Sequence, residues 1–177
     1  MTAHRSLSEA RQLLPEGSQV TGTISTVLQP GRIGVFVNLP HQTKGFVDVT
    51  SLPRDAGQWP TPGQVLQFEV LQHTPGQVRL WPLDPRFRHD EPTQEIVAGW
   101  CRAKLRYPVG STVTAQVTEV YPFNQEYWIR FTGDDTGRWC HALLSWTGEQ
   151  PVVGSTGRYR IVAHLDTTGR IMVAPEH

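Results

Sequence analysis

The sequence predicts an all-β protein built as two tandem five-stranded barrels, each preceded by a short α-helix. Apolar and polar residues alternate in short runs, as around Val20, Gly22 and Ile24, a period-two pattern typical of strands with one buried face. The chain also contains 16 glycines and 14 prolines, which suit short strands joined by tight turns. Several sequence signals return 93 residues further along the chain, which indicates a duplicated unit.

The first half of the chain contains the five strands of the first predicted barrel. Their residue ranges are 20–24, 35–39, 46–49, 65–71 and 77–81. The dipeptides Pro30-Gly31 and Pro75-Gly76 provide turns within the first and last strand pairs. A longer loop over residues 53–63, which carries Trp59, separates the third strand from the fourth. Five short strands with one long excursion after the third fit the Greek-key barrel of the oligonucleotide-binding (OB) fold.

A helix is expected ahead of each barrel. The first begins at Ser6, with Glu9 three residues on at the capping-box spacing. The second begins near residues 90–92 and runs to about Arg106, with apolar residues at helical spacing. Residues 82–92 are expected to form a linker before it. The predicted divisions are a helix with the first barrel, a linker with the interdomain helix, and a second barrel: 1–82, 83–107 and 108–177.

The duplication is visible at both ends and in the middle of the unit. Residues 15–21 (PEGSQVT) match residues 108–114 (PVGSTVT), 93 positions later. The last predicted strand of the first barrel and its counterpart at residues 169–175 have the same separation. At that separation Phe46-Val47-Asp48 falls on Trp139-Cys140-His141. The sequence therefore predicts two copies of one helix-plus-barrel unit.

Composition and charge exclude several classes of protein. Sixteen basic residues balance sixteen acidic ones, which argues against a general polyanion binder, since such proteins carry a basic excess. No apolar run approaches the roughly 18 residues of a membrane span, and the N-terminus lacks the apolar core of a secretory signal. A cytoplasmic protein without a membrane partner is the expectation.

Catalytic, metal and cofactor chemistry find little support in the sequence. Cys101 and Cys140 are the two cysteines, and free thiols are expected because neither a secretion signal nor a CxxC pair is present. The seven histidines are scattered, so no metal-ligand cluster and no cofactor are predicted. No nucleophile elbow, P-loop or zinc-protease motif occurs. We therefore expect a protein that is not an enzyme.

The order of motifs resembles the S-one RNA-binding domain, a repeat named after a large protein of the bacterial small ribosomal subunit. The resemblance rests on three runs in the first copy: residues 20–24, residues 34–39 (GVFVNL) and residues 45–52 (GFVDVTSL). It covers residues 16–82 and, more weakly, residues 108–175. The family implies an OB barrel that binds single-stranded RNA on one face. The family's binding residues are two aromatics, a histidine, an aspartate and an arginine, which stack on bases and contact phosphates.

The first copy keeps only part of this set. Phe36 matches the second aromatic, whereas Ile33 stands in the position of the first. Asp48 occupies the histidine position and Gln77 the arginine position. The candidate nucleic-acid contacts that remain in this copy are Phe36, Arg32, Lys44 and Arg79.

The second copy complements the first. His141 matches the family histidine, and Asp166 and Arg170 match the family aspartate and arginine. Alternation along residues 126–131 directs Trp128 and Arg130 outward and Ile129 and Phe131 into the core. Trp139 and His141, two residues apart, are expected to share one face of a strand. The candidate surface is therefore Trp128, Arg130, Trp139, His141, Asp166 and Arg170.

Two functions follow as alternatives. In the first, the protein is a non-catalytic binder of single-stranded RNA, or of single-stranded DNA or a ribonucleoprotein, and binds chiefly through the second barrel. In the second, it is a protein-interaction or structural module whose barrels no longer bind nucleic acid. The zero net charge, Asp48 and the missing first aromatic favour the second function. The alternative interpretation of the candidate surface is that either tryptophan is partly buried under the interdomain helix or against the other barrel.

Overall fold

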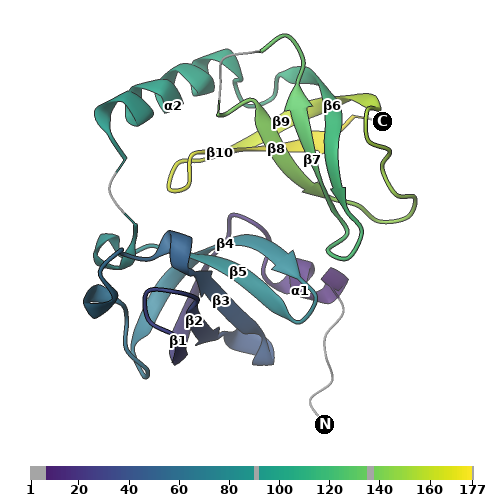
Figure 1. Ribbon diagram of the computed structural model, residues 1–177. Helices are drawn as coiled ribbons and strands as arrows, with labels where there is room; N and C mark the ends of the chain where they lie inside the picture. The colour runs from purple at the N-terminus through teal and green to yellow at the C-terminus, as the bar shows by residue number, and fades with distance from the viewer. Residues whose placement is uncertain (1–6, 90–91, 135–137, 177) are drawn as a thin grey trace. The chain divides into compact units, whose positions relative to one another are not determined.

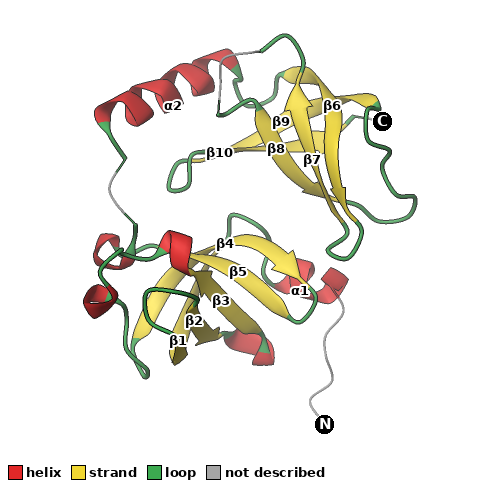
Figure 2. Cartoon of the chain, in the orientation of Figure 1, coloured by secondary structure: helices red, strands yellow, loops and turns green. Residues whose placement is uncertain are grey.

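The computed structural model describes residues 7–89, 92–134 and 138–176. The chain forms two compact units, residues 1–91 and residues 92–177. Figures 1 and 2 show that strands make up most of each unit, so the expected all-β class is confirmed.

The first unit is a closed five-stranded barrel that follows helix α1 (Leu7–Leu13). The start expected for this helix, Ser6, lies outside the described residues. The strands run in the order β1-β2-β3-β5-β4 around the barrel, and all five were predicted. They are β1 (Gln19–Leu28), β2 (Gly34–Asn38), β3 (Lys44–Asp48), β4 (Val65–Thr74) and β5 (Gln77–Pro82). The barrel closes where β3 pairs in parallel with β5, through Gly45 with Val78 and Phe46 with Arg79.

The inward-facing side chains of these strands form the core of the first unit. Ile24, Val47, Phe68 and Leu80 are each no more than 1% exposed, as expected for the apolar positions of alternating strands. Trp59, from the long loop, joins this core, and its indole Nε1 donates a hydrogen bond to the Pro53 carbonyl at 2.7 Å. The loop therefore covers part of the core instead of extending into solvent.

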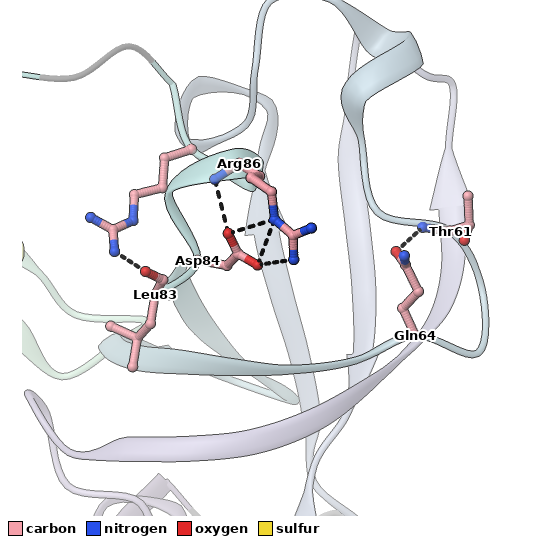
Figure 3. A network of polar contacts seen from close by, with 6 residues as sticks. Thr61, Gln64, Leu83, Asp84 and Arg86 are labelled. Atoms are coloured by element: carbon pink, nitrogen blue, oxygen red, sulfur yellow. Dashed lines mark hydrogen bonds and ion pairs between the residues drawn. The ribbon is translucent and has the colours of Figure 1, made fainter.

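The first part of the expected linker is folded onto the first unit. A short 3-10 helix, η4 (Pro85–Phe87), follows β5, and Asp84 caps it by accepting a hydrogen bond from the Arg86 amide. The Asp84 carboxylate also pairs with the Arg86 guanidinium, at 2.7 Å to Nη2, as Figure 3 shows. The His89 amide then donates to the Ser51 carbonyl. These contacts attach residues 84–89 to the first unit.

The second unit starts with helix α2 (Gln94–Arg106), which Thr93 caps by accepting a hydrogen bond from the Ile96 amide. The helix therefore begins slightly later than residues 90–92. It is followed by β6 (Thr112–Tyr121), β7 (Glu126–Phe131), β8 (His141–Ser145), β9 (Thr156–Leu165) and β10 (Arg170–Pro175).

The five strands of the second unit form a sheet in the order β10-β9-β6-β7-β8. This is the strand order of the first unit opened between its third and fifth strands. The hydrogen-bonded ladder that closes the first barrel has no equivalent between β8 and β10, both of which are fully described. The five strands predicted for the second unit are thus present, in a sheet without a ladder between β8 and β10.

The two units repeat the same local structure at matched positions. A β-bulge follows Ile24 in β1 and Val117 in β6, each in the pairing with the next strand. The Gly63 amide donates to the Ile24 carbonyl at 2.9 Å, and the Gly154 amide donates to the Val117 carbonyl at 2.8 Å. These matched contacts allow residues of one unit to be compared with their counterparts in the other.

Candidate nucleic-acid interface

The outer face of β7 and β8 carries an aromatic side chain beside two basic ones. Arg130 and His141 are direct cross-strand partners, and Trp128 lies two residues before Arg130 on the same face of β7. The predicted alternation of β7 is confirmed, because Ile129 and Phe131 are buried whereas Arg130 is exposed and Trp128 is half-buried.

Trp128 occupies the place that Phe36 has in the first unit. Phe36 pairs with Thr26, which lies just beyond the bulge in β1. Trp128 pairs with Glu119, which lies just beyond the matching bulge in β6. The partly buried side chains that pack on the second core include Trp139 and exclude Trp128. The second unit thus presents the larger aromatic ring at the position that corresponds to Phe36.

His141 does not occupy the position predicted for it. It lies opposite Arg130, just as Lys44 lies opposite Asn38 in the first unit. Its counterpart is therefore Lys44, and the predicted match with Asp48 is wrong. The connection before β8 is longer than the connection before β3, so a constant 93-residue separation fails there. The histidine nevertheless lies on the same outer face as Arg130.

Trp139 lies in the turn before β8, not on the strand with His141. Its ring packs against α2, with its centroid 6.3 Å from that of Trp100. A Cβ atom added at Gly99 would lie 2.3 Å from the ring, so only glycine permits this approach. Trp139 therefore packs against α2, the interdomain helix, as the alternative interpretation of the tryptophans had it, and does not belong to the β7–β8 face.

Asp166 holds α2 to the β9–β10 hairpin. Its Oδ1 accepts hydrogen bonds from Lys104 Nζ at 2.7 Å and from Trp100 Nε1 at 2.8 Å. The hydrogen bond from Lys104, and to a lesser extent that from Trp100, holds the pKa of the Asp166 carboxyl below its ordinary value. The carboxylate is thus engaged within the unit, and its side chain is 69% exposed. Arg170 starts β10, and its Nε donates to Thr168 Oγ1 at 3.2 Å.

The first unit has an aromatic–basic stack on its own outer face. The ring centroids of Phe36 and Phe46 are 5.1 Å apart, and the Arg79 guanidinium lies 4.7 Å from the centroid of Phe46. Arg79 also lies 3.6 Å from the Asp48 carboxylate, which in turn accepts hydrogen bonds from the amide and hydroxyl of Thr50. The charge of Arg79 is therefore partly balanced within the unit.

Phe46 is a member of this stack that the sequence analysis did not include. It is 7% exposed and lies on the outer side of β3, under Phe36 and Arg79. The alternation of Phe46, Val47 and Asp48 along the strand was the sequence signal for this placement. Val47 is buried in the core, so its neighbours Phe46 and Asp48 point to the other face.

The remaining candidates of the first unit are Lys44 and Arg32. Lys44 Nζ donates to Asn38 Oδ1 at 2.6 Å, at the exposed far end of β2 and β3. Arg32 is exposed in the connection between β1 and β2, next to Ile33. Lys44 is two residues before Phe46 on β3 and therefore on the same outer face of the strand.

Two further findings concern the described part of the chain. It contains no group of three or more His, Cys, Asp or Glu side chains placed to hold a metal ion. None of its helices has the length and apolar character needed to cross a membrane.

No protein-family model and no curated protein matches this chain. Among solved structures, a multidomain protein with nucleic acid binding domains from Streptococcus pneumoniae is 14% identical over 93% of this chain, with a TM-score of 0.32. GSP13 from Bacillus subtilis is 22% identical over 48% of this chain and 71% of its own, with a TM-score of 0.36. A structure of an a/eIF2alpha–aDim2p–rRNA complex from Pyrococcus horikoshii is 19% identical over 52% of this chain and 54% of that chain, with a TM-score of 0.34. The chain spans about half the length (53%) of the Streptococcus protein, and no family is assigned to it.

Proposed function

We propose that this protein is a non-catalytic nucleic-acid-binding protein and that it binds single-stranded RNA on the outer face of β7 and β8. The observation that carries the proposal is the placement of Trp128, Arg130 and His141 on one face of two adjacent strands. Directly opposed residues of an antiparallel pair have Cβ atoms about 5 Å apart. An aromatic ring and two phosphate-binding side chains therefore lie within the length of one or two nucleotides.

The chemistry of these side chains suits an unpaired strand. The half-buried Trp128 ring offers a face on which a base can stack, and such stacking contributes roughly 1–3 kcal/mol per base. Arg130 can donate two parallel hydrogen bonds to a phosphate, and His141 can donate one. A double helix would keep its bases stacked on each other and away from Trp128, so we expect single strands to bind in preference to duplexes.

The first unit is expected to contribute less. Its Phe46 ring is already covered by Phe36 and Arg79, and Arg79 faces the Asp48 carboxylate. Asp48 also places negative charge beside any phosphate that approaches Arg79. These contacts favour a secondary role for this face, or a role in contacting protein.

Binding of a fluorescent single-stranded RNA hexamer, measured by anisotropy over a salt series, tests the proposal. Trp128→Ala is expected to weaken binding roughly 5- to 100-fold, the equivalent of one lost stack. Arg130→Ala is expected to reduce the slope of log affinity against log salt by about 0.7, the value for one phosphate on a single strand. Arg160→Ala is the matched control, because Arg160 is exposed on β9 and pairs with Glu176.

Two results would overturn this proposal. If the wild-type protein binds neither RNA nor single-stranded DNA at low salt, the protein-interaction function replaces it. If Phe36→Ala and Arg79→Ala abolish binding while Trp128→Ala does not, the interface lies on the first unit. Thermal unfolding of each variant shows whether a loss of binding reflects a loss of fold.

A further inference from the structure

Helix α2 carries apolar side chains on two opposite faces. One face packs on the core of the second unit through Trp100 and Ala103. The opposite face is in solvent, where Val97 is 50% exposed, Leu105 is 83% exposed and Cys101 is exposed as well. A surface helix of a globular protein carries polar side chains on the face turned away from the core. The outer face of α2 therefore has the character of a face that packs against another surface.

The exposed apolar side chains of α2 form a continuous row. Val97, Cys101 and Leu105 follow each other at intervals of four residues, which places them on one ridge along the helix. Ala98, also exposed, lies three residues before Cys101 and extends the row sideways. Single exposed apolar residues are common on protein surfaces, whereas contiguous ones mark interaction sites. We call these four residues the outer stripe of α2.

The charges of α2 favour one orientation of a second copy of the same helix. Glu95 lies in the first turn, and Lys104 and Arg106 lie in the last turn. Two parallel copies would bring their basic ends together. Two antiparallel copies place Glu95 of each beside the basic half of the other, including Arg102, and also align their helix dipoles favourably. The helix is thus complementary in charge to an antiparallel copy of itself.

We propose that the outer stripe of α2 is a contact between two copies of this protein, which pack with antiparallel α2 helices about a twofold axis beside Cys101. Such a contact uses the same surface on both copies, so Val97 of one copy faces Leu105 of the other, and the reverse. One face of a 13-residue helix is smaller than the surface that a permanent dimer buries. We therefore expect a dimer that forms and dissociates with protein concentration. The inference does not require that the β7–β8 face bind RNA.

Sedimentation velocity of the full-length protein over a concentration series tests the proposal. The wild-type protein is expected to shift from monomer to dimer as the concentration rises. Leu105→Glu is expected to raise the dissociation constant about tenfold or more, because it places a carboxylate within an apolar contact. The matched control is Val152→Glu, which adds the same charge at a residue 69% exposed in the connection between β8 and β9.

Cross-linking with a short bismaleimide tests the orientation of the two helices. Cys101 is exposed and Cys140 is buried, so the wild-type dimer is expected to be linked through Cys101. The variants Val97→Cys/Cys101→Ser and Leu105→Cys/Cys101→Ser are then expected to link to each other in a mixture, but not each to itself. Val152→Cys/Cys101→Ser measures the linking caused by random collision.

A wild-type protein that stays monomeric at every concentration overturns the inference. In that case rapid labelling of Cys101 by maleimide shows a free outer stripe, and slow labelling shows that another part of the same chain covers it. A dimer that Leu105→Glu leaves intact also overturns the inference, and linking of each cysteine variant to itself overturns the antiparallel arrangement. Trp128→Ala is expected to leave the dimer unchanged, because Trp128 is on β7. Failure of the proposed RNA function and failure of the dimer contact are thus measured separately.

Discussion

His73 and His164 occupy matching positions on the fourth strand of each unit. His73 pairs with Val78, and His164 pairs with Ile171. In each hairpin the histidine directly follows the register shift of the fourth strand, which lies at residues 70–72 in β4 and at residues 161–163 in β9. His164 Nε2 lies 2.8 Å from the Tyr107 carbonyl, directly after α2. The carbonyls at the end of a helix lack partners within the helix, and this histidine supplies one.

His73 occupies the corresponding position in the first unit and is fully buried. Burial lowers the pKa of its ring from 6.5 to about 4, aided by the charge of Arg11 and opposed by hydrogen bonding to the backbone of Leu14 and Ala10. The folded protein therefore binds a proton at His73 less readily than the unfolded chain does. Stability from the neutral ring is complete above pH 6.5 and is lost as the pH falls toward 4.

We predict that the first unit loses roughly 1–3 kcal/mol of stability between pH 7 and pH 4.5 through His73 alone. His73→Gln keeps an N–H donor at this position but cannot titrate. Between pH 7 and pH 4.5 the unfolding free energy of the variant should therefore fall by roughly 1–3 kcal/mol less than that of the wild-type protein. Chemical denaturation at several pH values measures the difference. Parallel pH profiles for the two proteins would show that His73 is not responsible.

Sequence reasoning at the scale of single residues succeeded where strand alternation applied. It placed Trp128 and Arg130 on an outer face because Ile129 and Phe131 belong in the core. It did not predict the hydrogen bond that Asp166 accepts from Trp100, because the two residues are 66 positions apart along the chain. No local pattern encodes such a contact.

Helix α2 depends on a close approach between its backbone and Trp139. Alanine at Gly99 would place its Cβ 2.3 Å from the indole. Alanine is favoured over glycine inside a helix by about 1 kcal/mol, but the overpacking it causes here costs about 1–3 kcal/mol. Packing and helix propensity therefore act in opposite directions at this position.

We predict that Gly99→Ala lowers the unfolding free energy of the second unit by about 1–2 kcal/mol. In a Trp139→Ala background the same change should instead raise it by up to about 1 kcal/mol, because only the propensity effect remains. Denaturation of the two single variants and the double variant completes the cycle. Additive effects would show that α2 does not need Trp139 at this contact.

The register of β8 marks the limit of sequence reasoning at the scale of elements. The connection covers residues 39–43 before β3 but residues 132–140 before β8. The extra residues shift β8 relative to the 93-residue repeat, so Trp139 leaves the strand and His141 begins it. Strands with clear alternation, such as β1 and β7, were predictable because their pattern does not depend on the length of the connections.

The molecule contains two cores that share no residue. Phe68 belongs to the first and Phe131 to the second, and each is no more than 2% exposed. Replacing a buried phenylalanine by alanine typically costs 3–5 kcal/mol. Because the cores are separate, this cost should fall on one unit only.

We predict two unfolding transitions for the full-length chain. Phe68→Ala should lower only the transition of residues 1–91, and Phe131→Ala only that of residues 92–177. Hydrogen exchange followed by mass spectrometry assigns each transition to its peptides. A single transition that both variants shift equally would show that the units unfold together.

At the scale of the whole molecule, the sequence predicted the all-β class and the five strands of each unit. It did not predict that the second sheet stays open. Closure of a barrel requires backbone hydrogen bonds between strands that are distant in sequence, and apolar patterning does not report them. The longer connection before β8 and the packing of Trp139 against α2 are features of the unit that stays open.

The seam between β8 and β10 is held differently from the seam between β3 and β5. Backbone pairing joins β3 to β5 in the first unit, whereas no ladder joins β8 to β10 in the described structure. Leu144 of β8 and Ile171 of β10 nevertheless belong to one core. Side-chain packing therefore joins these two strands in the second unit, where backbone hydrogen bonds join their counterparts in the first.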